Sequence, residues 1–180
     1  FGVSTMSILV WTPDLATGIA EIDTQHKRIV SYINQLYELR QSHDRAKLGE
    51  VIGEMVDYTM SHFAFEEELI ENAGYSFSGP HRKVHQLFTR KVAEMQARFE
   101  AGEDVAGELH GMLSRWLFNH IMHEDRGYVD SVKTYLRTLS KPSGSEREQI
   151  TAEVLAHLQK QQKLHRQLHQ IPPAAGGELP

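Results

Sequence analysis

Side chains that bind metal ions recur at helical spacing between residues 26 and 125, and they constrain the fold more than any other feature. They lie in four stretches, DTQH, HFAFE, HRKVH and HIMHED. Two pairs are four residues apart, which places both members of a pair on one face of a helix. The candidate metal ligands are His26, His62, Glu66, His81, His85, His120 and Asp125.

Each ligand stretch also continues an apolar stripe, so its ligands are expected to point into a core. The stripes comprise Ile22, Ile29, Ile33 and Leu36; Leu48, Val51, Met55, Tyr58 and Leu69; Phe88, Val92, Met95 and Phe99; and Leu109, Leu113 and Trp116. Unpaired imidazoles and carboxylates are costly to bury. A single buried histidine is more often satisfied by a backbone carbonyl or a carboxylate than by a metal. Five imidazoles and two carboxylates that converge from four helices instead indicate a metal cluster.

The spacing of caps and breakers predicts four long helices, at about residues 23–42, 44–72, 80–101 and 104–139. Asp23 is a plausible N-cap for the first, Ala73-Gly74 ends the second, and Pro80 suits the first turn of the third. Residues 6–22 should form an irregular arm, with Trp11 packed over the bundle. We therefore expect an all-α fold, an up-down-up-down antiparallel four-helix bundle over residues 6–140.

The fourth stretch carries an irregular spacing. Its inward residues are three or four apart up to His120, and then five residues separate His120 from Asp125. Five residues rotate a regular helix face by about 140°, so both side chains cannot point inward without a local widening. We predict a π-type bulge between them, with the stripe resuming at Val129, Val132 and Leu136. The alternative is that Asp125 lies on the surface within the charged run HEDR.

Residues 141–180 form a C-terminal extension with its own pattern. Ser145 and Glu148 make a capping box, and an apolar seam from Ile150 to Ile171 predicts an amphipathic helix at about residues 145–171, ended by Pro172-Pro173. The residues after it are expected to be disordered. The helix could pack on the outside of the bundle, mediate self-association or dock another protein, and the sequence leaves these open.

Composition excludes several classes of protein. The 180 residues carry a net charge of -5 and include no cysteine, so thiolate metal sites, iron-sulfur clusters and disulfides are excluded. The acidic balance and the lack of a clustered basic face argue against a nucleic acid partner. We see neither a membrane-spanning stretch nor a signal-peptide pattern, and so expect no membrane association and a cytoplasmic location.

The ligand types suit iron, zinc or manganese, and their number suits two ions. If Glu66 and Asp125 both bridge, an ion on His81, His85 and His120 has five protein donors, and a solvent-derived oxo or hydroxo bridge completes six. Its neighbour, on His26 and His62, has five donors. One vacant position remains there for a small diatomic ligand.

Over about residues 10–140 the chain resembles bacterial hemerythrins. The resemblance is carried by Trp11, Gly18, Asp23, Gln25-His26, His62-Phe63, Glu66-Glu67, Gly74-Tyr75, His81, His85, His120-Ile121 and Asp125. It implies a non-haem di-iron centre with an oxo or hydroxo bridge that binds dioxygen reversibly at the two-histidine iron. It also implies that Phe63, Trp116, Leu117 and Ile121 line the dioxygen pocket.

The expected function is dioxygen storage or delivery inside the cell, without enzymatic activity. Alternatives are an oxygen or redox sensor that signals through the C-terminal helix, and a di-iron oxidase, peroxidase or NO-handling enzyme. Among the remaining histidines, His43 and His110 are expected to be solvated near helix ends. His123 is expected at the surface.

Overall fold

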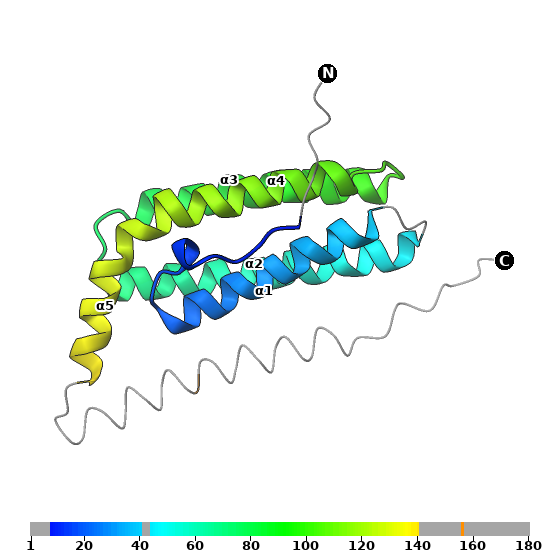
Figure 1. Ribbon diagram of the computed structural model, residues 1–180. Coiled ribbons are helices and arrows are strands. Elements are labelled where there is room, and N and C mark those ends of the chain that lie inside the picture. Colours follow the sequence, from blue (N-terminus) through cyan, green and yellow to red (C-terminus); the bar gives the residue numbers. More distant parts are fainter. Residues whose placement is uncertain (1–7, 41–43, 141–155, 157–180) are drawn as a thin grey trace. The chain divides into compact units, whose positions relative to one another are not determined.

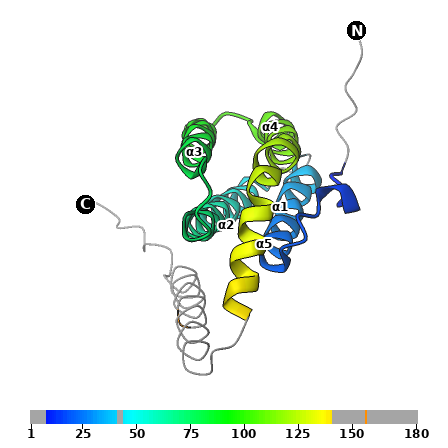
Figure 2. The same ribbon diagram turned by 90° about the vertical axis from the view of Figure 1, so that its left-hand side faces the viewer.

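The computed structural model describes residues 8–40, 44–140 and 156. Four helices, α1 (Ala20–Leu39), α2 (Arg45–Asn72), α3 (Ser78–Glu100) and α4 (Ala106–Asn119), run alternately in opposite directions (Figure 1). Helix α1 packs against α2 and α4, and α2 packs against α3. Viewed end-on, they form a four-helix bundle (Figure 2). The predicted fold class is confirmed.

The chain divides into two compact units, residues 1–135 and 136–180, and all candidate ligands lie in the first. The predicted C-terminal helix at residues 145–171 falls outside the described residues, apart from residue 156. The proposed boundary at residue 140 therefore stays a prediction. None of the helices within the described residues is long and apolar enough to span a membrane.

The second and third helices begin and end much as predicted. Asp44 caps α2 by accepting a hydrogen bond from the Lys47 backbone N–H at 2.9 Å. At the other end, Gly74 adopts a φ of 69°, which glycine reaches without steric cost. The backbone N–H of Tyr75 then donates to the Ile70 carbonyl at 3.0 Å, which closes the end of α2. Pro80 lies in the first turn of α3, as expected.

The predicted start of the first helix was wrong. Helix α1 begins at Ala20, so Asp23 lies inside its first turn and is not the N-cap. Its carboxylate instead accepts three hydrogen bonds from the arm: from the Thr17 N–H at 2.7 Å, the Thr17 hydroxyl at 2.8 Å and the Gly18 N–H at 3.0 Å. Asp23 therefore holds the arm against the beginning of α1.

The arm lies along the bundle and includes a short 3-10 turn, η1 (Pro13–Leu15). The Leu9 N–H donates to the Asn34 side-chain oxygen at 2.8 Å, and the Asn34 amide donates to the Leu9 carbonyl at 2.9 Å. Trp11 is half-buried against the core, with its ring centroid 6.4 Å from that of His26. Trp11 thus has the covering position expected for it.

The predicted π-type distortion is present. Residues His120–Asp125 form a π-helical segment, η2, between α4 and α5 (Arg126–Ser140). The chain changes direction there (Figure 1). The buried residues that follow are Tyr128 and Val132, whereas the predicted stripe residue Leu136 is 37% exposed and Val129 is only partly buried. The stripe prediction was thus wrong in part.

Two apolar clusters lie on either side of the ligands along the helices. The main cluster joins all four bundle helices, and the second joins Ile19, Ile22, Ile70, Tyr128 and Val132. In α1, His26 falls between Ile22 of the second cluster and Ile29 of the main one. In α2, the predicted Tyr58 and Leu69 are only partly buried, and the residues that follow them, Thr59 and Ile70, are buried instead. The ligands therefore occupy a polar layer between two apolar ones.

Candidate metal centre

The structure brings all seven candidate ligands together in the bundle interior. Helix α1 contributes one, α2 and α3 contribute two each, and η2 contributes the last two. None is more than 3% exposed, and they are His26, His62, Glu66, His81, His85, His120 and Asp125. The widened turn of η2 lets both of its ligands face inward despite their five-residue spacing.

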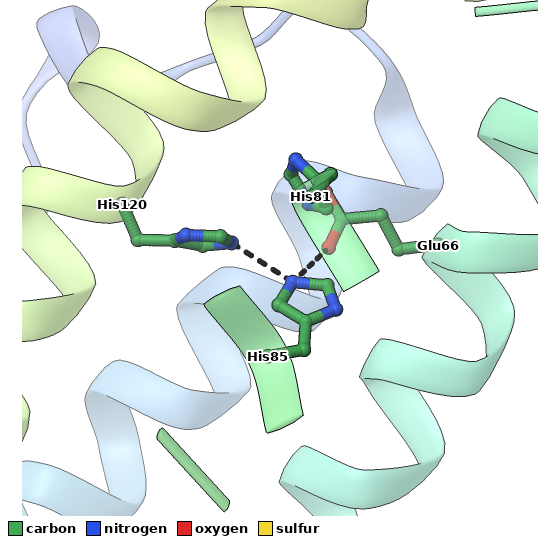
Figure 3. Close-up of side chains that lie close together, drawn as sticks. All are labelled: Glu66, His81, His85 and His120. Atoms are coloured by element: carbon green, nitrogen blue, oxygen red, sulfur yellow. Dashed lines mark hydrogen bonds and ion pairs between the residues drawn. The ribbon is translucent and has the colours of Figure 1, made fainter. Parts of the chain in front are cut away.

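Four of these residues already form a compact ligand set. Glu66, His81, His85 and His120 each offer one atom, and these atoms lie within 4.8 Å of one another (Figure 3). The Nε2 atoms of His85 and His120 are 2.9 Å apart. His85 Nε2 also lies 3.4 Å from a Glu66 carboxylate oxygen. This set offers three imidazole nitrogens and one carboxylate to a single ion.

The other two imidazoles lie beside the same two carboxylates, and their ring centroids are 4.7 Å apart. His62 Nε2 lies 3.4 Å from Glu66 Oε2, and His26 Nε2 lies 3.3 Å from Asp125 Oδ2. Asp125 Oδ1 in turn lies 3.0 Å from His120 Nε2. Glu66 and Asp125 therefore each lie near imidazoles of both groups, the pair His26 and His62 and the three histidines His81, His85 and His120, so each could contact two ions at once.

Several of these atoms have no conventional partner. Among the described residues, no hydrogen bond reaches either nitrogen of His26, either carboxylate oxygen of Glu66 or Asp125, or Nε2 of His81. Buried polar atoms without partners cost free energy, and the oxygens and nitrogens left over here are metal donors. The residues present therefore fit a metal cluster, and they fit it better than an ordinary hydrogen-bonded core.

Burial favours the unprotonated form of the imidazoles. It lowers the pKa of His62 to about 4 and that of His85 to about 2. Burial also lowers the pKa values of His26 and His120. Only an unprotonated ring nitrogen can bind a metal ion, so the apolar surroundings prepare these side chains as ligands.

The two carboxylates differ in their electrostatic surroundings. Burial, reinforced by the charge of Glu66, raises the pKa of Asp125 well above its ordinary value. Burial also acts to raise the pKa of Glu66. The His81 imidazole, whose Nε2 lies 3.7 Å from Glu66 Oε1, and the neighbouring His62 and His85 imidazoles outweigh burial and lower that pKa well below its ordinary value. Two positive ions between these groups would favour both carboxylates in their charged form.

Two ligand imidazoles are oriented by side chains outside the ligand set. Gln25 Oε1 lies 2.8 Å from Nδ1 of His62, and Glu67 Oε1 lies 2.9 Å from Nδ1 of His85. Each oxygen can only accept, so Nδ1 carries the proton and Nε2 is left free for a metal. The sequence indicated Gln25 and Glu67 only as neighbours of ligands, and their roles were not assigned.

Of the four residues predicted to line a dioxygen pocket, two stack on ligand imidazoles and two lie in the main core. Phe63 stacks on His85 with ring centroids 3.8 Å apart, and Trp116 stacks on His120 at 4.3 Å. Leu117 and Ile121 are buried in the main core. Phe63 also forms part of the wall of a mostly apolar cavity of about 190 Å³ lined by residues of α2, α3 and α4. These walls would limit the access of water to the ligands.

Histidines outside the ligand set partly contradict the predictions. His110 is not solvated as expected, because it is 2% exposed and its ring centroid lies 5.2 Å from that of Tyr37. Burial, with the charge of Arg40, lowers its pKa. His123 is exposed, as expected, and His43 falls outside the described residues.

Comparison with known proteins identifies the family to which this chain belongs. Residues 17–132 match the family described as the hemerythrin HHE cation binding domain. The chain belongs to the hemerythrin family. The resemblance seen in its sequence is thereby confirmed.

Similar hemerythrins come from several bacteria. A bacteriohemerythrin of Pseudomonas aeruginosa is 58% identical over 136 residues, which cover 76% of this chain and 89% of that protein. One from Stenotrophomonas maltophilia is 54% identical with the same coverage of both chains. A solved structure of wild-type hemerythrin is 27% identical with a TM-score of 0.67, and the match covers 70% of this chain and 98% of that one. The four-helix bundle is thus the fold of a solved hemerythrin.

Proposed function

We propose that this chain binds dioxygen reversibly at a di-iron centre and serves in dioxygen storage or delivery. The observation that carries the proposal is the unequal grouping of the imidazoles around Glu66 and Asp125. The ring centroids of His81, His85 and His120 lie within 5.0 Å of one another, and that of His26 lies 4.7 Å from that of His62. Equal sets would leave both ions equally saturated, whereas this division leaves one ion with fewer protein donors. Membership of the hemerythrin family supports iron as the metal.

The chain would hold one ion with His81, His85 and His120 and the other with His26 and His62, with both carboxylates shared. Bound iron would supply the electrons that dioxygen accepts on binding. The protein's part is to hold the five imidazoles in place and to favour the neutral form of four of them, since burial lowers the pKa values of His26, His62, His85 and His120. It also keeps water away, because Leu117 and Ile121 are at most 2% exposed.

The ligand chemistry favours binding over oxidation of a substrate. Di-iron oxygenases and ferritin-like bundles use ligand sets rich in glutamate, which donate more charge to the metal. Here five of seven candidate ligands are imidazoles. A less electron-rich site has a weaker tendency to cleave the O–O bond, so dioxygen can leave unchanged.

Iron content and visible spectra test the proposal. The protein should take up about two iron ions per chain when loaded anaerobically. Admission of dioxygen to the reduced protein should produce a visible charge-transfer band that disappears when the gas is removed. The band should be lost in His26→Ala and retained in His123→Ala, a matched change at an exposed histidine of η2. A single iron per chain, or a band that never reverses, would overturn the proposal.

A further inference from the structure

The two oriented ligand imidazoles differ in the charge of the group that orients them. Nδ1 of His85 donates to a carboxylate, Glu67 Oε1, at 2.9 Å. Nδ1 of His62 donates to a neutral amide oxygen, Gln25 Oε1, at 2.8 Å. The two contacts have nearly the same length and both engage Nδ1, so the charge of the acceptor is what distinguishes them.

The carboxylate of Glu67 is held in place by a cation. Arg82 Nε lies 3.1 Å from Glu67 Oε2, and Arg82 Nη2 lies 2.7 Å from Glu71 Oε2. Glu67 thus uses one oxygen for Arg82 and the other for His85. The Glu67 side chain is 22% exposed, whereas that of Arg82 is 41% exposed. A fixed ionic link therefore runs from the surface of α3 to the interior.

A negatively charged acceptor on Nδ1–H makes the imidazole a stronger electron donor through Nε2. This effect acts on His85, which belongs to the set of ligand atoms that already lie within 4.8 Å of one another. His62 belongs to the other set and has only the amide. The larger number of imidazoles and the negative charge next to His85 should therefore both strengthen metal binding at the three-histidine position.

We propose that Glu67 is a positioning residue that makes the three-histidine position the tighter of two metal positions, so that its ion binds first and leaves last. The inference rests on the proposed di-iron function, because it requires two ions. It adds an order in which the two ions bind and leave, and it names Glu67 as the residue that sets this order. At the two-histidine position, the neutral Gln25 takes the place of Glu67.

Release of Fe²⁺ to a chelator tests this order in the full-length protein. Protein loaded anaerobically with two Fe²⁺ per chain is mixed with excess ferrous chelator, and the coloured complex is followed over time. We expect two phases of equal amplitude. His26→Ala should lose the fast phase and His81→Ala the slow one, which assigns each phase to a position.

Two substitutions that exchange a carboxylate and an amide then test whether the charge next to the imidazole sets the rate of release. Glu67→Gln should accelerate the slow phase by about tenfold or more, the usual cost of losing an outer partner of a metal ligand, and leave the fast phase unchanged. Failure of Glu67→Gln to retain the slow ion at all, with the fast ion retained, would support the same conclusion. Gln25→Glu should slow the fast phase.

Glu71→Gln is the matched control. It also removes a carboxylate from Arg82, but the described structure gives Glu71 no contact with a ligand imidazole. Both phases should keep their rates in this variant. Thermal unfolding of the metal-free Glu67→Gln and Glu71→Gln proteins should show similar changes, which separates the effect on release from any loss of helix packing.

Equal acceleration of both phases by Glu67→Gln, or the same acceleration by Glu71→Gln, would overturn the inference and leave Glu67 with a merely structural role. Release of a single ion per chain from the wild-type protein would overturn this inference and the di-iron proposal together. Two ordered phases without a reversible dioxygen band would overturn dioxygen binding alone, because iron release does not depend on it.

Discussion

Acid should destabilise the metal-free protein through its buried histidines, and His62 allows the size of the effect to be worked out. Burial lowers the pKa of His62 to about 4 in the folded protein. In the unfolded chain it returns to about 6.5. Between these values the unfolded chain binds the proton and the folded protein does not. The effect of His62 on stability is therefore absent above about pH 6.5, the folded state loses stability as the pH falls from about 6.5 to about 4, and the loss is complete below that.

The magnitude follows from the two pKa values. Moving from pH 8 to pH 5 should remove about 2 kcal/mol from the free energy of unfolding through His62 alone, and about 3 kcal/mol should be lost below pH 4. The lowered pKa values of His26, His85 and Glu66 act in the same direction. The raised pKa of Asp125 acts in the opposite direction, since the folded state binds that proton more readily.

Because these groups interact, the His62 contribution has to be measured as a difference. Urea unfolding of the wild-type and His62→Leu proteins, both freed of metal with EDTA, should be followed at pH 8 and pH 5. The loss of unfolding free energy between these pH values should be about 2 kcal/mol smaller in His62→Leu. Equal losses in the two proteins would refute the reasoning, because they would mean that His62 has an ordinary pKa in the folded state.

Three further predictions concern residues around the centre. Asp125→Ala should lower the iron content from about two to about one per chain, yet leave the melting temperature of the metal-free protein unchanged or raise it, because no hydrogen bond within the described residues reaches that buried carboxylate. A lower melting temperature with full iron content would contradict this. Asp23→Ala should cost about 1–3 kcal/mol in urea unfolding, since it removes three hydrogen bonds to the arm. Asp44→Ala, which removes one cap hydrogen bond, should cost about 1 kcal/mol. If Asp23→Ala costs no more than Asp44→Ala, the hydrogen bonds from Asp23 to the arm do not stabilise the protein. Ile22→Ala should cost about 2–5 kcal/mol, because Ile22 is 0% exposed in the second cluster. Met60→Ala, at a residue 44% exposed, should stay within about 0.5 kcal/mol of the wild type, and thermal or urea unfolding compares the two.

The sequence by itself determined the features that depend on spacing along one helix. The four-residue interval between His62 and Glu66 fixes a shared face, and the apolar stripe around it fixes which face is buried. The five-residue step from His120 to Asp125 was enough to predict η2. The bounds of α2 followed from Asp44 and Gly74, because caps and stops act within a turn of the helix.

Only the tertiary structure decided which side chains meet across helices. Asp23 was misread as an N-cap because α1 begins three residues earlier, at Ala20, and its carboxylate accepts from Thr17 and Gly18 at the end of the arm. The extra residue in η2 shifts the register that follows, so Tyr128 is fully buried and Val129 is not.

The burial of His110 beside Tyr37 likewise depends on the packing of α4 against α1. The contact of Glu67 with His85 depends on which helix lies next to α2. Helical periodicity places a side chain on a face. The choice of neighbour for that face is made by packing among whole helices, which no local spacing encodes.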